Sequence, residues 1–385
     1  MCLKKKNPKK NNKKNSYNIN TEFQNILKME KKNEPTKMST KQKYDMMWNI
    51  FFALLLIPTG IGLYFLFRDT QKFINNIKIR NPLYKFPEIS DLKQVLLILP
   101  IIIILKVICE SAFINISEKI MKKQYKNPKD EKNFILGKIY KGKITSHMFK
   151  GSYYLFITIF GWYVLKDLDY FPTDLLGKGY MPNMFLKGYP DSYYHVKPKF
   201  LDLYYMICLS YFLCDLIWLL FVYERQSDFI NMFLHHICTI SLISFSYLTN
   251  YSNIGSIVLL IHNETDIFVH LTRLLLQTDC PEIFKNISGV TLTINFLYMR
   301  IFVLAKGIYC VYHYVTWDDG WVTFSLVSFL TFLYFMHVNW AIMLLQKAFV
   351  LVLGTKLSDT TNYDKTLEKK EKEILKSEEM KCKDN

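Results

Sequence analysis

The sequence has no Cys-x-x-Cys motif, and its eight cysteines are scattered along 385 residues. Closely spaced cysteines are typical of disulfide frameworks and zinc sites, so neither kind of structure is indicated. No glycine-rich phosphate-binding loop occurs either. The lysine-rich tails, such as KKKNPKKNNKKN near the amino end, lack interleaved aromatic residues. We therefore expect polar, disordered tails that face anionic lipid headgroups, and no binding to nucleic acid.

Long apolar runs fill the centre of the chain. Half of all residues are apolar, yet the mean hydropathy is only +0.07, because two polar tails offset the hydrophobic centre. A helix needs about 20 apolar residues to cross the roughly 30 Å of hydrocarbon in a bilayer. The sequence therefore predicts an all-α polytopic membrane protein with about eight transmembrane helices, at Met46–Phe67, Gln94–Ile116, Met148–Leu165, Leu201–Tyr223, Phe229–Thr249, Ile254–Leu276, Ser288–Tyr314 and Trp321–Leu353.

Charge and apolar sequence divide the chain into five parts. We predict a Lys/Asn-rich cytosolic tail at 1–45, two N-terminal transmembrane helices at 46–116, a basic cytosolic loop at 117–147, a six-helix domain at 148–353 and a charged cytosolic tail at 354–385. An even number of spans places both termini on one side, and thirteen lysines before Trp48 predict that this side is the cytosol. Lys381 and Lys383 fit a dilysine retrieval signal of the endoplasmic reticulum.

Ionisable residues interrupt the apolar runs. Such residues are costly in hydrocarbon unless a partner, a water-filled cavity or a chemical role offsets the cost. At about 100° per residue, one face of the predicted helix Ile254–Leu276 carries four of them, with Asn263 at its edge: His262, Asp266, His270 and Arg273. Glu264 points to the far side of the same helix. This stripe is a candidate functional face.

Two neighbouring predicted spans bring polar groups to the same depth. His235 and His236 lie about 10 Å from the cytosolic end of their helix at 1.5 Å per residue, and Asp266 lies at a matching depth on the helix that runs back. Asp215 reaches a similar level on the preceding span. The sequence therefore predicts a polar chamber inside a helical bundle, nearer the cytosol.

Histidines and a carboxylate at one depth favour acid–base or nucleophilic chemistry. A neutral imidazole acts as base or nucleophile, and a carboxylate orients it and stabilises its cation. Because His235 and His236 diverge by about 100°, we expect one to do chemistry and the other to orient. One alternative is that these groups only join helices by hydrogen bonds. Another is metal ligation by His262 and Asp266, which is disfavoured because no known zinc-motif spacing is present.

The stretch SDFINMFLHHICTISLISFSYLTNYSNIGSIVLLIHNETDIF resembles the Lag1 motif of ceramide synthases, within the TRAM-Lag1-CLN8 (TLC) domain family. The matching features are LHH at Leu234–His236, SYLT, IGSIVL, and the H-x-x-x-D of His262 and Asp266. Weaker similarity extends over about Asp91–Lys356 and includes Lys106 and Glu110, one helical turn apart before the domain. YMRIFVL, with Arg300, is similar to a later helix of the family, and HVNWAIMLLQKAF to the last.

The resemblance implies a six-helix TLC core and an enzyme of the endoplasmic reticulum membrane. Its reaction moves a fatty acyl group from acyl-CoA, as co-substrate, to the amine of a sphingoid base, among membrane lipids and with no bound cofactor. The implied catalytic residues are His235, His236 and Asp266. The chamber around them has the supporting residues His262, Asn263, Asp215 and His270. A homo- or hetero-oligomer is left open.

Acyl-CoA needs cationic partners near the cytosolic mouth, because the sequence has no phosphate loop. Arginines suit phosphate recognition, and the candidates are Arg225, Arg273 and Arg300. Positive charge on cytosolic segments is an equally direct explanation for such residues.

Two residues depart from the family's pattern. Asn263 stands where the motif usually carries an aspartate, in H-D-x-x-D, and Asp215 is more similar to members that are not synthases. These departures leave open a non-catalytic TLC-domain protein that binds lipid or assists membrane-protein insertion. A proton-coupled transporter is a third class, for which neither an inverted repeat nor paired Gly/Pro-broken helices are found.

Overall fold

The computed structural model describes residues 40–80, 87–126, 131–186, 198–222, 229–315 and 320–352. The chain forms two compact units, Met1–Leu56 and Ile57–Asn385. In the first unit the described residues are the beginning of a helix, and the second unit holds all other described elements. The described residues contain no β-strand, only the isolated bridges Met121–Thr278 and Pro172–Gly179. The predicted all-α class is confirmed.

The helices follow one another along the chain with short connections. In order they are α2 (Thr40–Arg80), η1 (Ile89–Lys93), α3 (Gln94–Ile120), α4 (Lys123–Lys126), α5 (Glu131–Leu165), η2 (Thr173–Leu175), α6 (Asn183–Leu186), α7 (Leu201–Phe221), α8 (Phe229–Leu248), α9 (Ser252–Gln277), α10 (Glu282–Phe296), the π-helical turn η3 (Leu297–Val303), α11 (Leu304–Tyr314) and α12 (Trp321–Val352).

Six helical segments of the described chain are long and apolar enough to cross a membrane. They are Ile89–Ile120, Leu201–Phe221, Phe229–Leu248, Ser252–Gln277, Glu282–Tyr314 and Trp321–Phe349. The protein is therefore a polytopic membrane protein, and six of the eight predicted spans meet this criterion. The other two lie within α2 and α5, where the chain is helical as expected, and their membrane crossing stays a prediction.

The predicted basic loop at 117–147 is wrong as a loop. Within it the chain forms α4, and α5 begins already at Glu131, 17 residues before the predicted span. The physical reason is packing: α5 lies alongside α9, so its polar first half continues the helix that the apolar half begins. Lysines have good helix propensity and do not end a helix.

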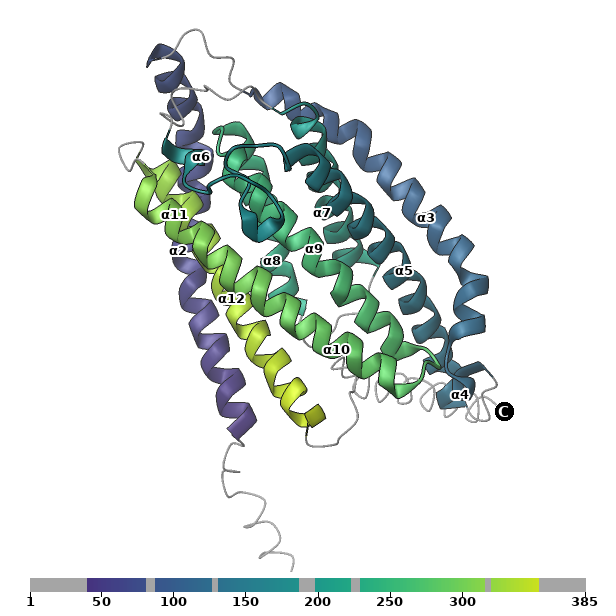
Figure 1. Ribbon diagram of the computed structural model, residues 1–385. Coiled ribbons are helices and arrows are strands. Elements are labelled where there is room, and N and C mark those ends of the chain that lie inside the picture. Colours follow the sequence, from purple (N-terminus) through teal and green to yellow (C-terminus); the bar gives the residue numbers. More distant parts are fainter. Residues whose placement is uncertain are drawn as a thin grey trace, which may run out of the picture. The chain divides into compact units, whose positions relative to one another are not determined.

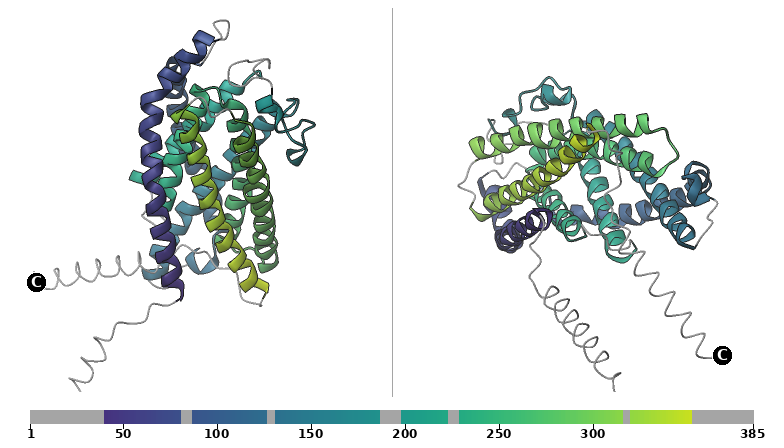
Figure 2. Two further views of the ribbon diagram at one scale, coloured as in Figure 1. Left: turned by 90° about the vertical axis from the view of Figure 1, so that its left-hand side faces the viewer. Right: turned by 90° about the horizontal axis from the view of Figure 1, so that it is seen from below.

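The long helices of the second unit lie side by side, with α5 between α3 and α9 in Figure 1. α3 also contacts α7, and α8 contacts both α7 and α12. The view from below shows α10, η3 and α11 as one run of helix across the bundle (Figure 2). Side chains of α3, α5, α7, α8, α9, η3 and α12 can therefore meet in the interior.

The turn between α8 and α9 brings these two helices together. Three residues join them, and Asn250 takes a left-handed backbone conformation with φ of 64°. Gly255 makes the close approach possible, because a Cβ there would lie 2.1 Å from the hydroxyl of Tyr205 and 2.8 Å from Oγ of Ser246. The α8 and α9 spans were predicted within two residues at each end of the observed helices.

The segment 166–186, which contains η2 and α6, lies against the opposite end of the bundle from the predicted chamber. Lys306 of α11 forms a salt bridge of 2.9 Å with Asp174, and the Tyr298 hydroxyl donates a hydrogen bond to the Asp174 carbonyl. Phe185 of α6 reaches the bundle interior near Tyr251. This segment therefore covers one end of the space between α8, α9, α11 and α12.

Candidate active site

A buried cluster of charged groups lies where α3, α5, α7 and α8 meet. Lys150 of α5 lies 2.6 Å from Oδ1 of Asp215 and donates a hydrogen bond of 2.8 Å to Oδ2. Lys106 of α3 lies 3.8 Å from Oδ1, and Nε2 of His236 lies 3.6 Å from Oδ2. All of these side chains are at most 14% exposed. Weak solvent screening strengthens their attraction. Asp215 is therefore the carboxylate that faces the histidine pair.

Further imidazole and indole rings gather beside this cluster. The ring centre of His337 lies 4.7 Å from that of His262 and 6.2 Å from that of His235. Trp340 lies 5.3 Å from His235, and the rings of His235 and His236 are 5.8 Å apart. All four histidines are buried. The pair predicted from the sequence thus lies between the charged cluster and a second group of rings, formed by His262, His337 and Trp340.

His262 has a defined tautomer. Its Nδ1 lies 2.6 Å from the carbonyl oxygen of Val258, which can only accept a hydrogen bond. Nδ1 therefore carries the proton, and in the neutral ring the lone pair is on Nε2. Among the described residues Nε2 has no hydrogen-bond partner. The nitrogen is thus available to a substrate group.

Asp266 pairs with an arginine from another helix. Nη2 of Arg300 lies 2.5 Å from Oδ1 of Asp266 and donates a second hydrogen bond, of 3.1 Å, to the carbonyl of His262. Arg300 sits in η3 and is 3% exposed. The predicted catalytic carboxylate thus pairs with Arg300, which also binds the backbone carbonyl of His262. Arg300 is held in the interior, and its predicted contact with acyl-CoA stays a prediction.

The two neighbours of the stripe on α9 point to other helices. Asn263 is fully buried, and its Nδ2 donates hydrogen bonds to the Tyr204 hydroxyl, at 3.1 Å, and to Sγ of Cys208, at 3.7 Å. Glu264 accepts a hydrogen bond of 2.8 Å from Asn295 of α10. Asn263 therefore faces α7 and Glu264 faces α10. This agrees with the sequence prediction that Glu264 lies away from the stripe.

The remaining supporting residue, His270, pairs with a histidine of α5. Nδ1 of His270 and Nδ1 of His147 are 3.1 Å apart, so one of them donates and the other accepts. The ring of His270 stacks on Tyr154, with a centroid distance of 5.3 Å. Arg273 follows one turn later on α9. Arg225 lies outside the described residues, so its role in binding acyl-CoA stays a prediction.

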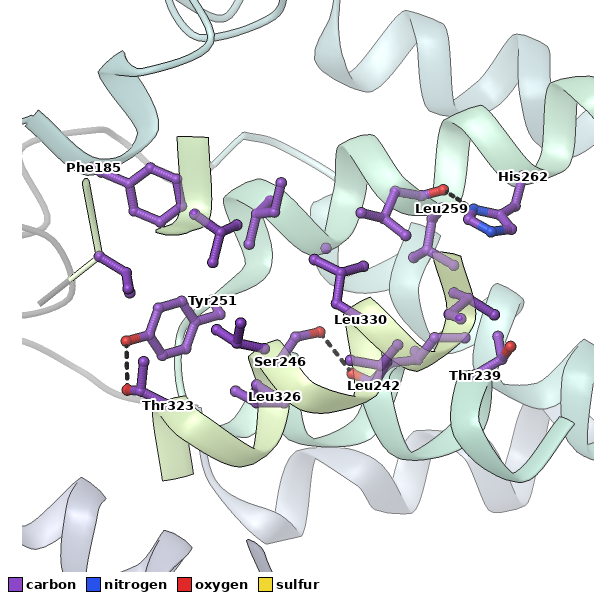
Figure 3. Close-up of a pocket in the computed structure, with 18 of the residues that line it drawn as sticks. Phe185, Thr239, Leu242, Ser246, Tyr251, Leu259, His262, Thr323, Leu326 and Leu330 are labelled. Atoms are coloured by element: carbon purple, nitrogen blue, oxygen red, sulfur yellow. Dashed lines mark hydrogen bonds between the residues drawn. The ribbon is translucent and has the colours of Figure 1, made fainter. Parts of the chain in front are cut away.

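An apolar pocket extends from His262 to the far end of the bundle. It is lined mainly by aliphatic side chains of α8, α9, α11 and α12. Figure 3 shows His262 at one end, and Phe185, Tyr251 and Thr323 at the other, where the hydroxyls of Tyr251 and Thr323 are 3.0 Å apart. A long apolar chain in this pocket would end at the histidines.

The structure adds three residues to the site that the sequence did not single out as functional. Lys106 and Lys150 hold Asp215, and His337 joins His235 to His262. A signal for each was present, since all three are ionisable residues in or beside apolar runs. Among the described residues no three His, Cys, Asp or Glu side chains are arranged to bind one metal ion.

Together, the fold and site define a polytopic membrane protein with a buried histidine and carboxylate centre at the end of an apolar pocket. Residues 143–346 match the model of the TLC domain, which is just over half of the 385 residues. The chain belongs to the TLC domain family. The match begins after α3, so Lys106 lies outside it, whereas both histidines of the pair, Asp266 and Arg300 lie inside.

Curated relatives agree with this assignment. The chain is 26% identical over 240 residues to ceramide synthase hyl-1 of Caenorhabditis elegans, covering 56% of this chain and 60% of that protein. It is 28% identical over 118 residues to ceramide synthase LOH2 of Arabidopsis thaliana, covering 31% of this chain and 38% of that protein. With ceramide synthase 5 of Homo sapiens it shares 24% over 183 residues, covering 46% of each chain. The chain thus spans between about two fifths and three fifths of these relatives.

Proposed function

We propose that this protein is a ceramide synthase, which transfers a fatty acyl group from acyl-CoA to the amine of a sphingoid base and forms a (dihydro)ceramide. The observation that carries the proposal is a group of buried histidines that faces the Asp215 carboxylate through His236 and ends an apolar pocket with His262. The Asp266–Arg300 pair lies beside the backbone of His262. The names of the relatives support the same reaction.

The chemistry of the reaction needs a base and a place for charge. The C–S bond of the thioester breaks, a C–N bond forms, the amine gives up a proton and CoA leaves as the thiol. A buried neutral imidazole takes the proton or attacks the carbonyl itself. His236 faces Asp215, which stabilises an imidazolium, and the Arg300 cation beside Asp266 favours negative charge developing on the acyl oxygen.

The apolar pocket suits the acyl chain. Concave sites with mostly apolar walls are the usual binding sites for small apolar groups. With its carbonyl near His262, an acyl chain would extend toward Phe185 and Tyr251. Arg273, one turn beyond His270, is then a candidate for the phosphates of CoA.

We further propose a location in the endoplasmic reticulum with both termini in the cytosol. The support is the distribution of lysines around the spans and the pair Lys381 and Lys383. The tails that carry these lysines lie outside the described residues. In this orientation the histidine pair lies near the cytosol, where CoA is released.

The proposal is tested with membranes from cells that lack endogenous ceramide synthase and express this chain. Given labelled sphinganine and acyl-CoA of several lengths, they are expected to make labelled dihydroceramide that depends on the thioester. Membranes with free fatty acid in place of acyl-CoA are the control. If no product forms at any chain length although the protein is folded, the chain is instead a TLC-domain protein that binds lipid without catalysis.

The far end of the pocket should set the longest acyl chain. We expect Leu326→Trp, which places an indole among the residues lining the pocket, to lower kcat/KM for long acyl-CoA by about tenfold or more, because excluding even one methylene from an apolar pocket has effects of that size. Shorter acyl-CoA should react as before. Phe324→Trp, on an exposed position of the same helix, is the matched control. Equal losses of kcat/KM at all chain lengths would mean that this pocket does not bind the acyl chain.

A further inference from the structure

α3 brings a fully buried cation to the histidine pair from outside the matched TLC domain. Lys106 is 1% exposed, and its Nζ lies 4.5 Å from the centre of the Trp218 ring and 5.8 Å from that of Phe149. Burying an ammonium group is costly unless charges or hydrogen bonds compensate. Its acidic partner Asp215 already pairs with Lys150 at 2.6 Å. Two lysines therefore face the one carboxylate that also faces His236, and Glu110 of α3 is a second acidic neighbour of both lysines.

The two oxygens of Asp215 are used unequally. The nearest oxygen to Lys106 is Oδ1, whereas Lys150 contacts both oxygens, at 2.6 Å from Oδ1 and through a hydrogen bond of 2.8 Å to Oδ2. The imidazole of His236 faces Oδ2 with Nε2. An ionised carboxylate only accepts, so this arrangement favours the tautomer of His236 with the proton on Nε2. The lone pair is then on Nδ1, which has no hydrogen-bond partner among the described residues.

We propose that Lys106 and Lys150 are positioning residues for acyl transfer, which hold Asp215 as an anion with Oδ2 toward Nε2 of His236. His236 is thereby kept neutral and oriented, and its Nδ1 takes the proton that the amine loses when the C–N bond forms. This inference rests on the proposed function, and it makes α3 part of the active centre although the family's domain begins after it.

Charges around His236 make opposite contributions to its protonation. Asp215 on α7 favours the imidazolium, whereas Lys150 on α5 and Lys106 on α3 oppose it. On its own helix His235 is the neighbouring ring, and Glu110 lies one turn beyond Lys106 on α3. Removing the anion therefore lets His236 stay neutral at lower pH, and removing a lysine makes it protonate at higher pH. If Asp215 and the lysines only stabilised the fold, removing the anion and removing a lysine would not shift the pH dependence of activity in opposite directions.

The test is the pH dependence of kcat/KM of purified protein for three variants and a control. Asp215→Asn is expected to lower kcat about 100-fold, and Lys106→Met about tenfold, with KM for acyl-CoA within about threefold. The acid limb of the profile should move about one pH unit down for Asp215→Asn and up for Lys106→Met. Lys106→Arg keeps the cation and should restore most of the loss. Lys285→Met removes a lysine that is also buried but pairs with Glu282 on α10, and should keep the wild-type kcat.

Acid limbs that stay fixed, or that move in the same direction in both variants, overturn the proposal. So does a loss of activity that merely follows the amount of folded protein. If Lys106→Met does not fold, Lys150→Met provides the same test, because that lysine is partly exposed and opposes the same imidazolium. If the wild-type protein itself forms no amide, the proposed function fails. If the wild-type protein is active but the acid limbs of the variants' pH profiles do not move, only the positioning role of the lysines fails.

Discussion

His236→Ala is expected to abolish acyl transfer while the protein remains folded. The variant lacks the imidazole that faces Asp215 at 3.6 Å, and with it the group that takes the proton from the amine. Loss of a general base or nucleophile lowers rates by about 10²–10⁴-fold, so we expect turnover at least about 10²-fold below wild type. The measurement is dihydroceramide formed per mole of folded protein, with binding of acyl-CoA measured separately.

Two controls separate chemistry from packing in this experiment. His235→Ala leaves His236 in place and removes the ring between it and His337, so it should cost less than His236→Ala. His313→Ala changes an exposed histidine of α11 and should have no effect. If His236→Ala retains more than a tenth of the wild-type turnover, His236 is not the base.

Asp266→Asn is expected to lower turnover by about 100-fold or more with little loss of folded protein. Asparagine keeps the shape and can still accept the hydrogen bond from Nη2 of Arg300. It removes the charge, however, and leaves a buried arginine cation without its counter-ion beside the histidine rings. An electrostatic change of this kind alters the stabilisation of the transition state by orders of magnitude. The measurement is again kcat per folded protein.

Glu264→Gln is the matched control for Asp266→Asn, because it makes the same change two residues away on the same helix. Glu264 accepts from Asn295 of α10, and glutamine can accept in the same way, so the effect should be within about twofold. Equal activity of the two variants would mean that the charge of Asp266 has no part in catalysis. A loss of folded protein that accounts for the Asp266→Asn defect would mean that the pair joins α9 to η3 and nothing more.

Much of the fold could be predicted because it depends on local sequence. The apolar run and its length fixed α8 and α9 within two residues, and helix geometry placed His235, His236 and Asp215 at one depth. The structure does bring His236 and Asp215 together. The lysine-rich range 117–147 was predicted as a loop, but α5 already begins at Glu131, because a polar sequence can continue a helix when a neighbour such as α9 supports it.

The partners within the site could not be predicted, because helix geometry gives depth and face but not which helices are neighbours. Arg300 was expected at the mouth for acyl-CoA, and the structure places it against Asp266. His337 meets His235, and Lys150 meets Asp215, through contacts between residues more than 60 positions apart in the sequence. Such long-range contacts leave no periodicity in the sequence.

The most direct test of catalysis by this site is the mass balance of the purified protein in lipid nanodiscs. Wild-type protein is given sphinganine and a long-chain acyl-CoA, and free CoA thiol and dihydroceramide are measured together. We expect one CoA released for each dihydroceramide formed, and neither product from His236→Ala. Absence of dihydroceramide from folded wild-type protein, or equal amounts from wild type and His236→Ala, would contradict catalysis by this site.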